Sequence, residues 1–90
     1  MLKLFKVSGN SLFPFYKDGQ RILCLKVFKF NPVKKDDTVV FSKDSYGLMV
    51  KKVISINNGQ YFVQGTDPLS IDSRNFGTIS LNEIHYKVLF

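Results

Sequence analysis

Residues 48–64 read Leu-Met-Val-Lys-Lys-Val-Ile-Ser-Ile-Asn-Asn-Gly-Gln-Tyr-Phe-Val-Gln. The segments Leu48–Ile56 and Tyr61–Gln64 are rich in β-branched and aromatic residues, and Asn57-Asn58-Gly59 separates them. Two such segments around a short glycine-containing loop are typical of a β-hairpin. This stretch therefore predicts a hairpin and sets the fold class.

The rest of the chain continues the β pattern. No window has a sustained apolar period of 3.6 residues, so we expect no helix longer than a turn, near Leu12–Tyr16 or Leu81–Ile84. Gly65–Asn75 is expected to be a polar loop. Short strands with Gly, Pro and Asn between them indicate an all-β barrel or pair of sheets, with residues 1–90 as one domain. The further strands are expected at Arg21–Val27, Thr38–Ser42, Phe76–Leu81 and Ile84–Leu89.

Composition excludes several classes of function. The 90 residues carry a net charge of +6 and contain one cysteine and one histidine. A structural zinc site needs four ligands, and a disulfide within the chain needs two cysteines, so we expect neither. Cys24 lies in the apolar run Ile22–Leu25 and is expected to be a buried structural residue rather than half of a Cys–His pair.

The sequence also indicates whether contact with a membrane or with nucleic acid is expected. The longest apolar run has four residues, and the alternating N-terminus has no apolar core of a signal peptide. We therefore expect a soluble chain, cytoplasmic or peripheral to a membrane. The basic charge permits contact with anionic lipid or nucleic acid without demonstrating either.

The segment Ser8-Gly9-Asn10-Ser11-Leu12-Phe13-Pro14 could expose a nucleophile. Gly9 permits a turn that leaves the Ser11 hydroxyl accessible and backbone amides free, and Pro14 stiffens the exit. That arrangement suits attack on a carbonyl whose developing oxyanion is bound by N–H groups. An ordinary loop has the same composition, so the segment alone leaves both interpretations open.

A serine nucleophile needs a base. His85 lies in a predicted strand with no evident carboxylate partner, whereas a lysine could serve if burial favoured its neutral form. Lys51 shares one face of its predicted strand with Met49 and Val53, and Lys52 shares the other with Val50 and Ile54. Both faces are apolar, so alternation does not choose between the two lysines, and both could instead be solvated.

A third group of polar residues is Ser70-Ile71-Asp72-Ser73-Arg74-Asn75-Phe76-Gly77. Asp72 and Arg74 are two residues apart, so they project the same way from an extended chain. They are expected to form an ion pair that fixes the loop geometry.

Taken in order, these segments resemble the type I signal peptidase family of serine proteases, which use a Ser/Lys dyad. The family's Gly-x-Ser-Met-x-Pro is matched by residues 9–14, with leucine for methionine, and its Asp-Gly before an apolar strand by residues 18–19. Its Lys-x-Gly-Asp-x-Val-Val-Phe is matched by residues 34–41, with aspartate for glycine. Its base segment, apolar-x-Lys-Arg-Val, is matched by residues 49–53, and its Gly-Asp-Asn by Gly65-Thr66-Asp67. Its Ser-x-Asp-Ser-Arg-x-Phe-Gly is matched by residues 70–77.

The resemblance implies a fold and a set of roles. The fold would be the small, coiled, partly open β-barrel of the signal-peptidase and LexA-like catalytic core. Ser11 would be the nucleophile, its N–H an oxyanion donor, and Lys51 the base. Ser70 would orient the lysine, and Asp72 and Arg74 would hold the loop. The enzyme would cleave a peptide or protein substrate after small residues, without a cofactor or metal.

Two further expectations concern partners. The alternative to a protease is a non-catalytic β-barrel module that binds a partner protein or nucleic acid. The serine and lysine at the two matching positions favour the enzyme, and we do not expect nucleic acid to be the partner. Phe5, Phe13, Phe15 and Tyr16 flank the Ser11 turn. They form either an exposed patch that docks on a membrane or partner protein, or part of the core.

Overall fold

The computed structural model describes residues 2–6, 19–27, 32–43, 47–66, 69 and 71–89. A four-residue helix, α1 (Ser73–Phe76), and a 3₁₀ turn, η2 (Leu81–Glu83), are the helical elements of these residues. The strands are β1 (Leu2–Lys6), β2 (Arg21–Lys26), β3 (Thr38–Lys43), β4 (Gly47–Asn57), β5 (Gln60–Gln64), β6 (Ile79–Ser80) and β7 (Ile84–Val88). The all-β prediction is confirmed.

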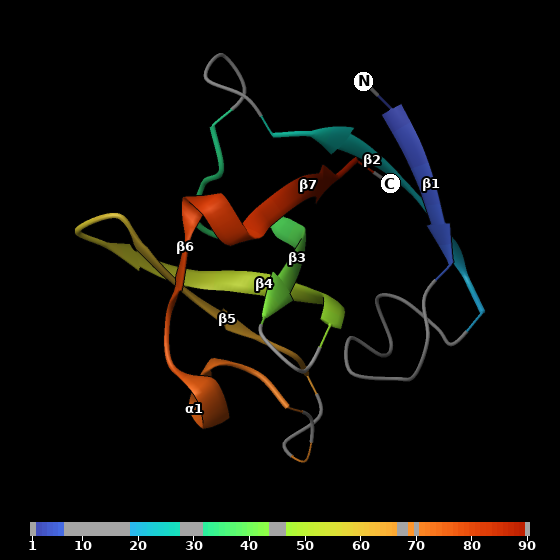
Figure 1. Cartoon of the computed structure of the whole chain (residues 1–90). Helices are drawn as coiled ribbons and strands as arrows, with labels where there is room; N and C mark the ends of the chain where they lie inside the picture. The colour runs from blue at the N-terminus through green and yellow to red at the C-terminus, as the bar shows by residue number, and fades with distance from the viewer. Residues whose placement is uncertain are drawn as a thin grey trace.

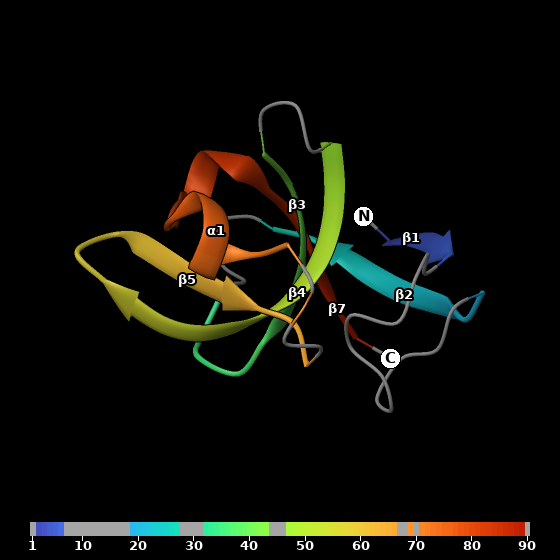
Figure 2. The same cartoon turned by 90° about the horizontal axis from the view of Figure 1, so that it is seen from below.

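All seven strands belong to one antiparallel sheet in the order β1-β2-β7-β3-β4-β5-β6. The sheet coils strongly but is not closed, and the described parts of β1 and β6 form its two edges (Figures 1 and 2). The last strand, β7, lies in the interior of the sheet between β2 and β3.

The predicted hairpin is present as β4 and β5. Its turn residues, Asn58 and Gly59, have positive φ angles of 52° and 74°. Positive φ at both central positions is the requirement of the turn that matches the twist of two antiparallel strands, and Asn-Gly is its preferred sequence. The turn chemistry thus explains why this prediction held.

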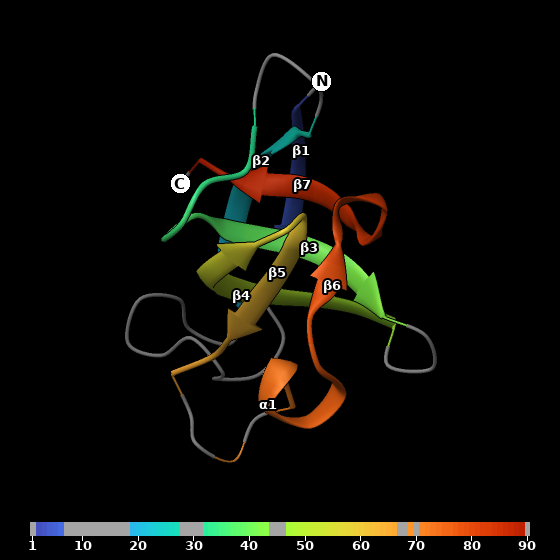
Figure 3. The same cartoon turned by 90° about the vertical axis from the view of Figure 1, so that its left-hand side faces the viewer.

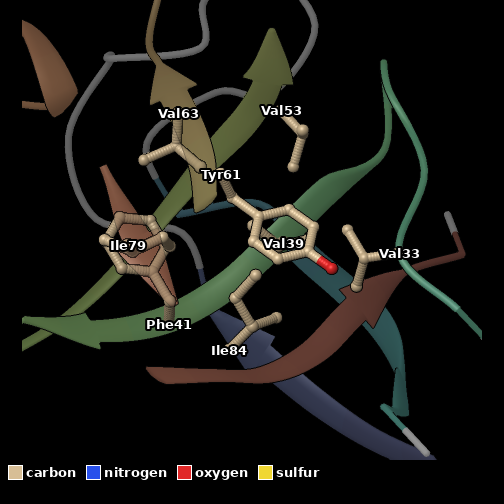
Figure 4. Close-up of a cluster of buried hydrophobic side chains, with 8 residues drawn as sticks. All are labelled: Val33, Val39, Phe41, Val53, Tyr61, Val63, Ile79 and Ile84. Atoms are coloured by element: carbon tan, nitrogen blue, oxygen red, sulfur yellow. The ribbon is translucent and has the colours of Figure 1, made fainter. Parts of the chain in front are cut away.

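The main cluster of buried apolar residues lies on one face of the sheet. Figure 4 shows the side chains of β3, β5, β6 and β7 converging there, with Tyr61 in the middle. Its members are Val33, Val39, Phe41, Val53, Tyr61, Val63, Ile79 and Ile84. A second cluster, formed by Ile22, Cys24 and Val40, contains the alternate residue Val40 of β3 and so lies on the opposite face.

Two irregularities in the ladder decide which side chains reach the main cluster. Val40 pairs with Tyr86 and Phe41 with Ile84, so His85 is an extra residue in β7. Similarly, Ile54 is an extra residue in β4, between the partners of Val63 and Phe62. Each extra residue reverses the alternation, which lets Ile84 join the main cluster although Tyr86 packs on the second one.

Three expectations about the elements need correction or refinement. A strand over Phe76–Leu81 is wrong, because Phe76 ends α1 and only Ile79–Ser80 pairs, with β5. The Gly65–Asn75 loop already contains the first turn of α1, whose N-cap is Asp72. β1 was not predicted. The one-turn helix expected near Leu81 is present as η2, while the one near Leu12–Tyr16 lies outside the described residues.

A search of the described residues finds no helix with the length and apolarity needed to cross a membrane.

Candidate active site

Lys51 is a buried lysine in the middle of β4. It is 3% exposed, whereas the side chain of its neighbour Lys52 is 41% exposed. The Lys52 ammonium lies 3.8 Å from an Asp36 carboxylate oxygen at the surface. The choice of Lys51 as the buried lysine is therefore confirmed.

The sheet explains the difference between the two lysines. Lys51 pairs with Val39, and Val39 and Val53 both belong to the main cluster, so Lys51 projects from the same face as that cluster. The turn at residues 34–37 lies beside this part of β4, because the Val53 N–H donates to the Asp37 carbonyl at 2.8 Å. Lys52 lies on the opposite face.

Asp72 and Arg74 form the predicted ion pair. The Arg74 guanidinium donates from Nη2 at 2.6 Å and from Nε at 2.9 Å, one bond to each carboxylate oxygen of Asp72. The Asp72 side chain is fully buried, while that of Arg74 is 32% exposed. A two-pronged arrangement of this kind fixes both the distance and the orientation of the pair.

The same carboxylate also holds the backbone on both sides of the loop. It accepts the Gly65 N–H at 3.0 Å and the Arg74 N–H at 3.0 Å. In return the Asp72 N–H donates to the Asn75 side chain at 3.1 Å, which completes a capping box at the start of α1. Ser73 adds a link to β5, because its Oγ accepts the Val63 N–H at 2.9 Å.

These contacts control the ionisation of Asp72. Burial alone would raise its pKa, but the hydrogen bonds from the Arg74 side chain, the Gly65 N–H and the Arg74 N–H, with the positive charge of Arg74, lower it to about 2. The carboxylate is thus ionised throughout the ordinary pH range.

The loop and the lysine meet at the end of β5. Lys52 pairs with Gln64, so the next residue, Gly65, lies level with Lys51 across the β4–β5 ladder. Gly65 is also the residue that Asp72 binds. The fold therefore brings Lys51, Asp72 and Arg74 to one region, with α1 beside the end of β5 (Figure 3).

Gly9, Ser11 and Ser70 lie outside the described residues, and so do Phe13, Phe15 and Tyr16. Of the predicted aromatic patch, Phe5 is described. Its ring packs edge-on against Tyr86, with centroids 5.2 Å apart, and it is half-buried against the second cluster.

The two other candidate residues have different surroundings. His85 is exposed, and its Nε2 lies 2.8 Å from the Ser42 hydroxyl. Cys24 is fully buried, and burial raises the pKa of its thiol to about 11, so it is a structural residue as predicted.

Ser73 and Asn75 are the residues of this region whose roles the sequence interpretation missed. The sequence signal for these roles was the pattern Asp72-Ser73-Arg74-Asn75. An aspartate that can cap a helix is followed three residues later by a side chain that can accept a hydrogen bond from the aspartate's backbone N–H.

Neither metal ligands nor known relatives identify the site. Among the described residues there is no group of three or more His, Cys, Asp or Glu side chains that could hold a metal ion. No protein-family model matches the chain, and no curated protein matches it either.

Proposed function

We propose that this protein is a serine endopeptidase of the signal-peptidase type, with Ser11 as nucleophile and Lys51 as base. Its sheet would then be a small version of the partly open catalytic barrel of that family. The substrate would be a peptide or protein, cleaved after a small residue.

The reaction would follow the acyl-enzyme route. The neutral Lys51 amine takes the proton of the Ser11 hydroxyl as Oγ attacks the scissile carbonyl, and the Ser11 N–H donates to the oxyanion. The resulting ammonium returns the proton to the leaving amine. Water, deprotonated by the same amine, then hydrolyses the ester and frees the serine. Ser70 would orient Lys51, Asp72 and Arg74 would hold the loop, and Gly9 would permit the Ser11 turn.

The burial of Lys51 is the observation that carries the proposal. A lysine at the surface is protonated at neutral pH and cannot accept a proton, while burial among apolar groups favours the neutral amine. Of two adjacent lysines, the buried one is the one that the family pattern assigns as base. A module that only bound an anionic partner would have no need to bury a lysine on its core face.

The described aromatic residues give no support to the nucleic-acid alternative. Stacking of bases needs exposed rings. All six aromatic residues in the described part of the chain are buried or half-buried.

The first prediction is loss of peptidase activity on removal of either proposed catalytic group. Lys51→Met keeps an unbranched side chain out to Cε and removes the amine, and Ser11→Ala removes the hydroxyl. Each should lower kcat/KM on a fluorogenic peptide, with alanine at the first and third positions before the bond, by at least about a hundredfold. Intact mass after incubation with a penem-type acylating agent should show one adduct on the parent and none on Ser11→Ala.

Lys52→Met is the matched control, since it removes the neighbouring amine from the opposite face of β4. It should retain activity within a few-fold of the parent, and thermal melts should show all three variants folded. Equal activity in the parent and Lys51→Met, or an adduct that persists in Ser11→Ala, would contradict the proposed dyad.

A further inference from the structure

The tip of the β4–β5 hairpin is an exposed loop of two residues. β4 ends at Asn57 and β5 begins at Gln60, and these are cross-strand partners, so Asn58 and Gly59 form the turn between them. All residues from 54 to 60 are exposed. The tip projects away from the rest of the sheet (Figures 1 and 2). Water therefore reaches both the Asn58 side chain and the Gly59 backbone.

The order of these two residues favours a reaction between them. Asn58 is the one asparagine of the sequence that a glycine follows. Asparagine is a thermolabile residue, because the backbone nitrogen of the next residue can attack its carboxamide carbon and close an unstrained ring. A side chain on that next residue hinders the attack, and glycine has none. The sequence Asn58-Gly59 thus removes the steric barrier to ring closure.

The conformation of the turn lets the two groups meet while the strands stay paired. Asn58 has a φ of 52° and Gly59 a φ of 74°. Type I′ and type II′ turns both suit a two-residue hairpin, share positive φ at the first position and differ in the sign of φ at the second. In type II′ the ψ of the first residue is about −120°, which brings the next nitrogen in line with Cβ. Because Gly59 accepts either sign of φ, the peptide group between the two residues can rotate into that geometry.

The Gly59 N–H is available for this reaction. In the described part of the chain no backbone hydrogen bond occupies it, since the ladder beside the turn pairs Asn57 with Gln60. A methyl group at Gly59 would have no atom within 4 Å, so the described residues leave the turn open on that side. A base in the solvent can therefore remove the Gly59 proton without breaking a hydrogen bond of the sheet.

We infer that Asn58 is a site of spontaneous deamidation in the folded protein. The Gly59 nitrogen loses its proton to a base in the solvent and bonds to Cγ of Asn58, and the carboxamide nitrogen takes up a proton and leaves as ammonia. Water then opens the cyclic imide at either of its two carbonyl groups. Opening at one carbonyl gives an aspartyl residue. Opening at the other gives an isoaspartyl residue, in which the main chain runs through the former side chain.

The two products have different effects on the hairpin. The aspartyl product keeps the main chain and places a negative charge within residues 53–65, which contain no charged residue in the sequence. The isoaspartyl product adds a carbon atom to the main chain of a two-residue turn. Loop length fixes the register of a hairpin, and in the present register Ile56 pairs with Tyr61 of the main cluster. The isoaspartyl product is therefore the less stable of the two.

The second prediction is tested by prolonged incubation in neutral buffer, followed by digestion and fragment-ion mass spectrometry. Asn58 should gain the mass that replaces NH₂ by OH at least about tenfold faster than Asn82, an exposed asparagine that precedes Glu83. Asn58→Gly, which lacks the carboxamide, should show no gain in the turn. Ion exchange should separate the two products, and the isoaspartyl one should unfold at lower urea concentration than the parent.

A second measurement tests whether the folded protein reacts. Urea at concentrations that leave the sheet folded should not change the rate at Asn58. If the hairpin had to open first, the rate would rise with urea, because urea favours the opened form. Such a rise, or equal rates at Asn58 and Asn82, would overturn the inference. The reaction involves the turn residues and water, so its outcome is independent of the proposed peptidase activity.

Discussion

The Asp72 carboxylate accepts hydrogen bonds from the Gly65 N–H, the Arg74 N–H and both Nε and Nη2 of the Arg74 guanidinium. Because these bonds lower its pKa to about 2 from an ordinary value near 3.8, the ionised form stabilises the fold. That contribution is fully present above pH ~3.8 and is lost as the pH falls through ~2. A shift of this size corresponds to about 2 kcal/mol.

The third prediction follows from this residue. Asp72→Asn should lower the free energy of unfolding by about 2 kcal/mol at neutral pH, and its deficit relative to the parent should narrow as the pH falls from 4 toward 2. Urea unfolding at a series of pH values measures this. Asp36→Asn is the control, because its ion pair with Lys52 is long and exposed and contributes little. A deficit that is the same at every pH would show that the charge of Asp72 does not stabilise the fold.

The fourth prediction concerns Cys24. Its thiol is fully buried, and its pKa is raised to about 11 by that burial, so almost no thiolate is present at neutral pH. The thiolate is the reactive species. Labelling by iodoacetamide should therefore be slow in the native protein and fast in guanidinium chloride, as followed by intact mass. Equal rates in the two conditions would mean that the strand β2 opens readily.

At the scale of elements, the β4–β5 hairpin depends on its turn. The fifth prediction is that Gly59→Ala lowers the free energy of unfolding by about 1–2 kcal/mol, measured by urea unfolding. A methyl group there would meet no atom within 4 Å, so the cost arises from the φ of 74° rather than from a clash. Asn58→Gly, which keeps positive φ easy at the other turn position, should change stability much less. A neutral Gly59→Ala would mean that the turn can change its conformation freely.

An element could be predicted from the sequence when the residues that determine it are neighbours in the chain. The hairpin could be predicted because Asn58-Gly59 itself demands the turn. α1 was missed because its four residues have no apolar period, and the Asp72–Asn75 capping box alone defines its start. β1 was missed because alternating leucine and lysine also suits an exposed tail, and its pairing with β2 joins residues far apart in the chain.

The candidate site was likewise only partly predictable, because some of its features depend on contacts between distant residues. Alternation could not distinguish Lys51 from Lys52, because β4 contributes to apolar clusters on both faces of the sheet. The family pattern selected Lys51, and its burial agrees. The Asp72–Arg74 pair was predictable from spacing, but the contact of Asp72 with Gly65 needed the tertiary structure.

At the scale of the whole molecule, the order of the strands was beyond prediction from local patterns. No short-range signal says that β7 lies between β2 and β3, since each of these pairings joins distant parts of the chain. The bulges at His85 and Ile54 could not be predicted either, because a bulge is defined by how its strand pairs with the partner strand.

The interior position of β7 also has a consequence for the protein during its synthesis. β1 and β2 can pair as soon as both leave the ribosome, and so can β3, β4 and β5. In the described residues, however, β2 reaches β3 only through β7, the last of the seven strands in chain order. The nascent chain therefore carries two separate half-sheets, each with an open edge, until Val88 has emerged. The two halves become one sheet only when β7 has left the ribosome and can pair with both β2 and β3.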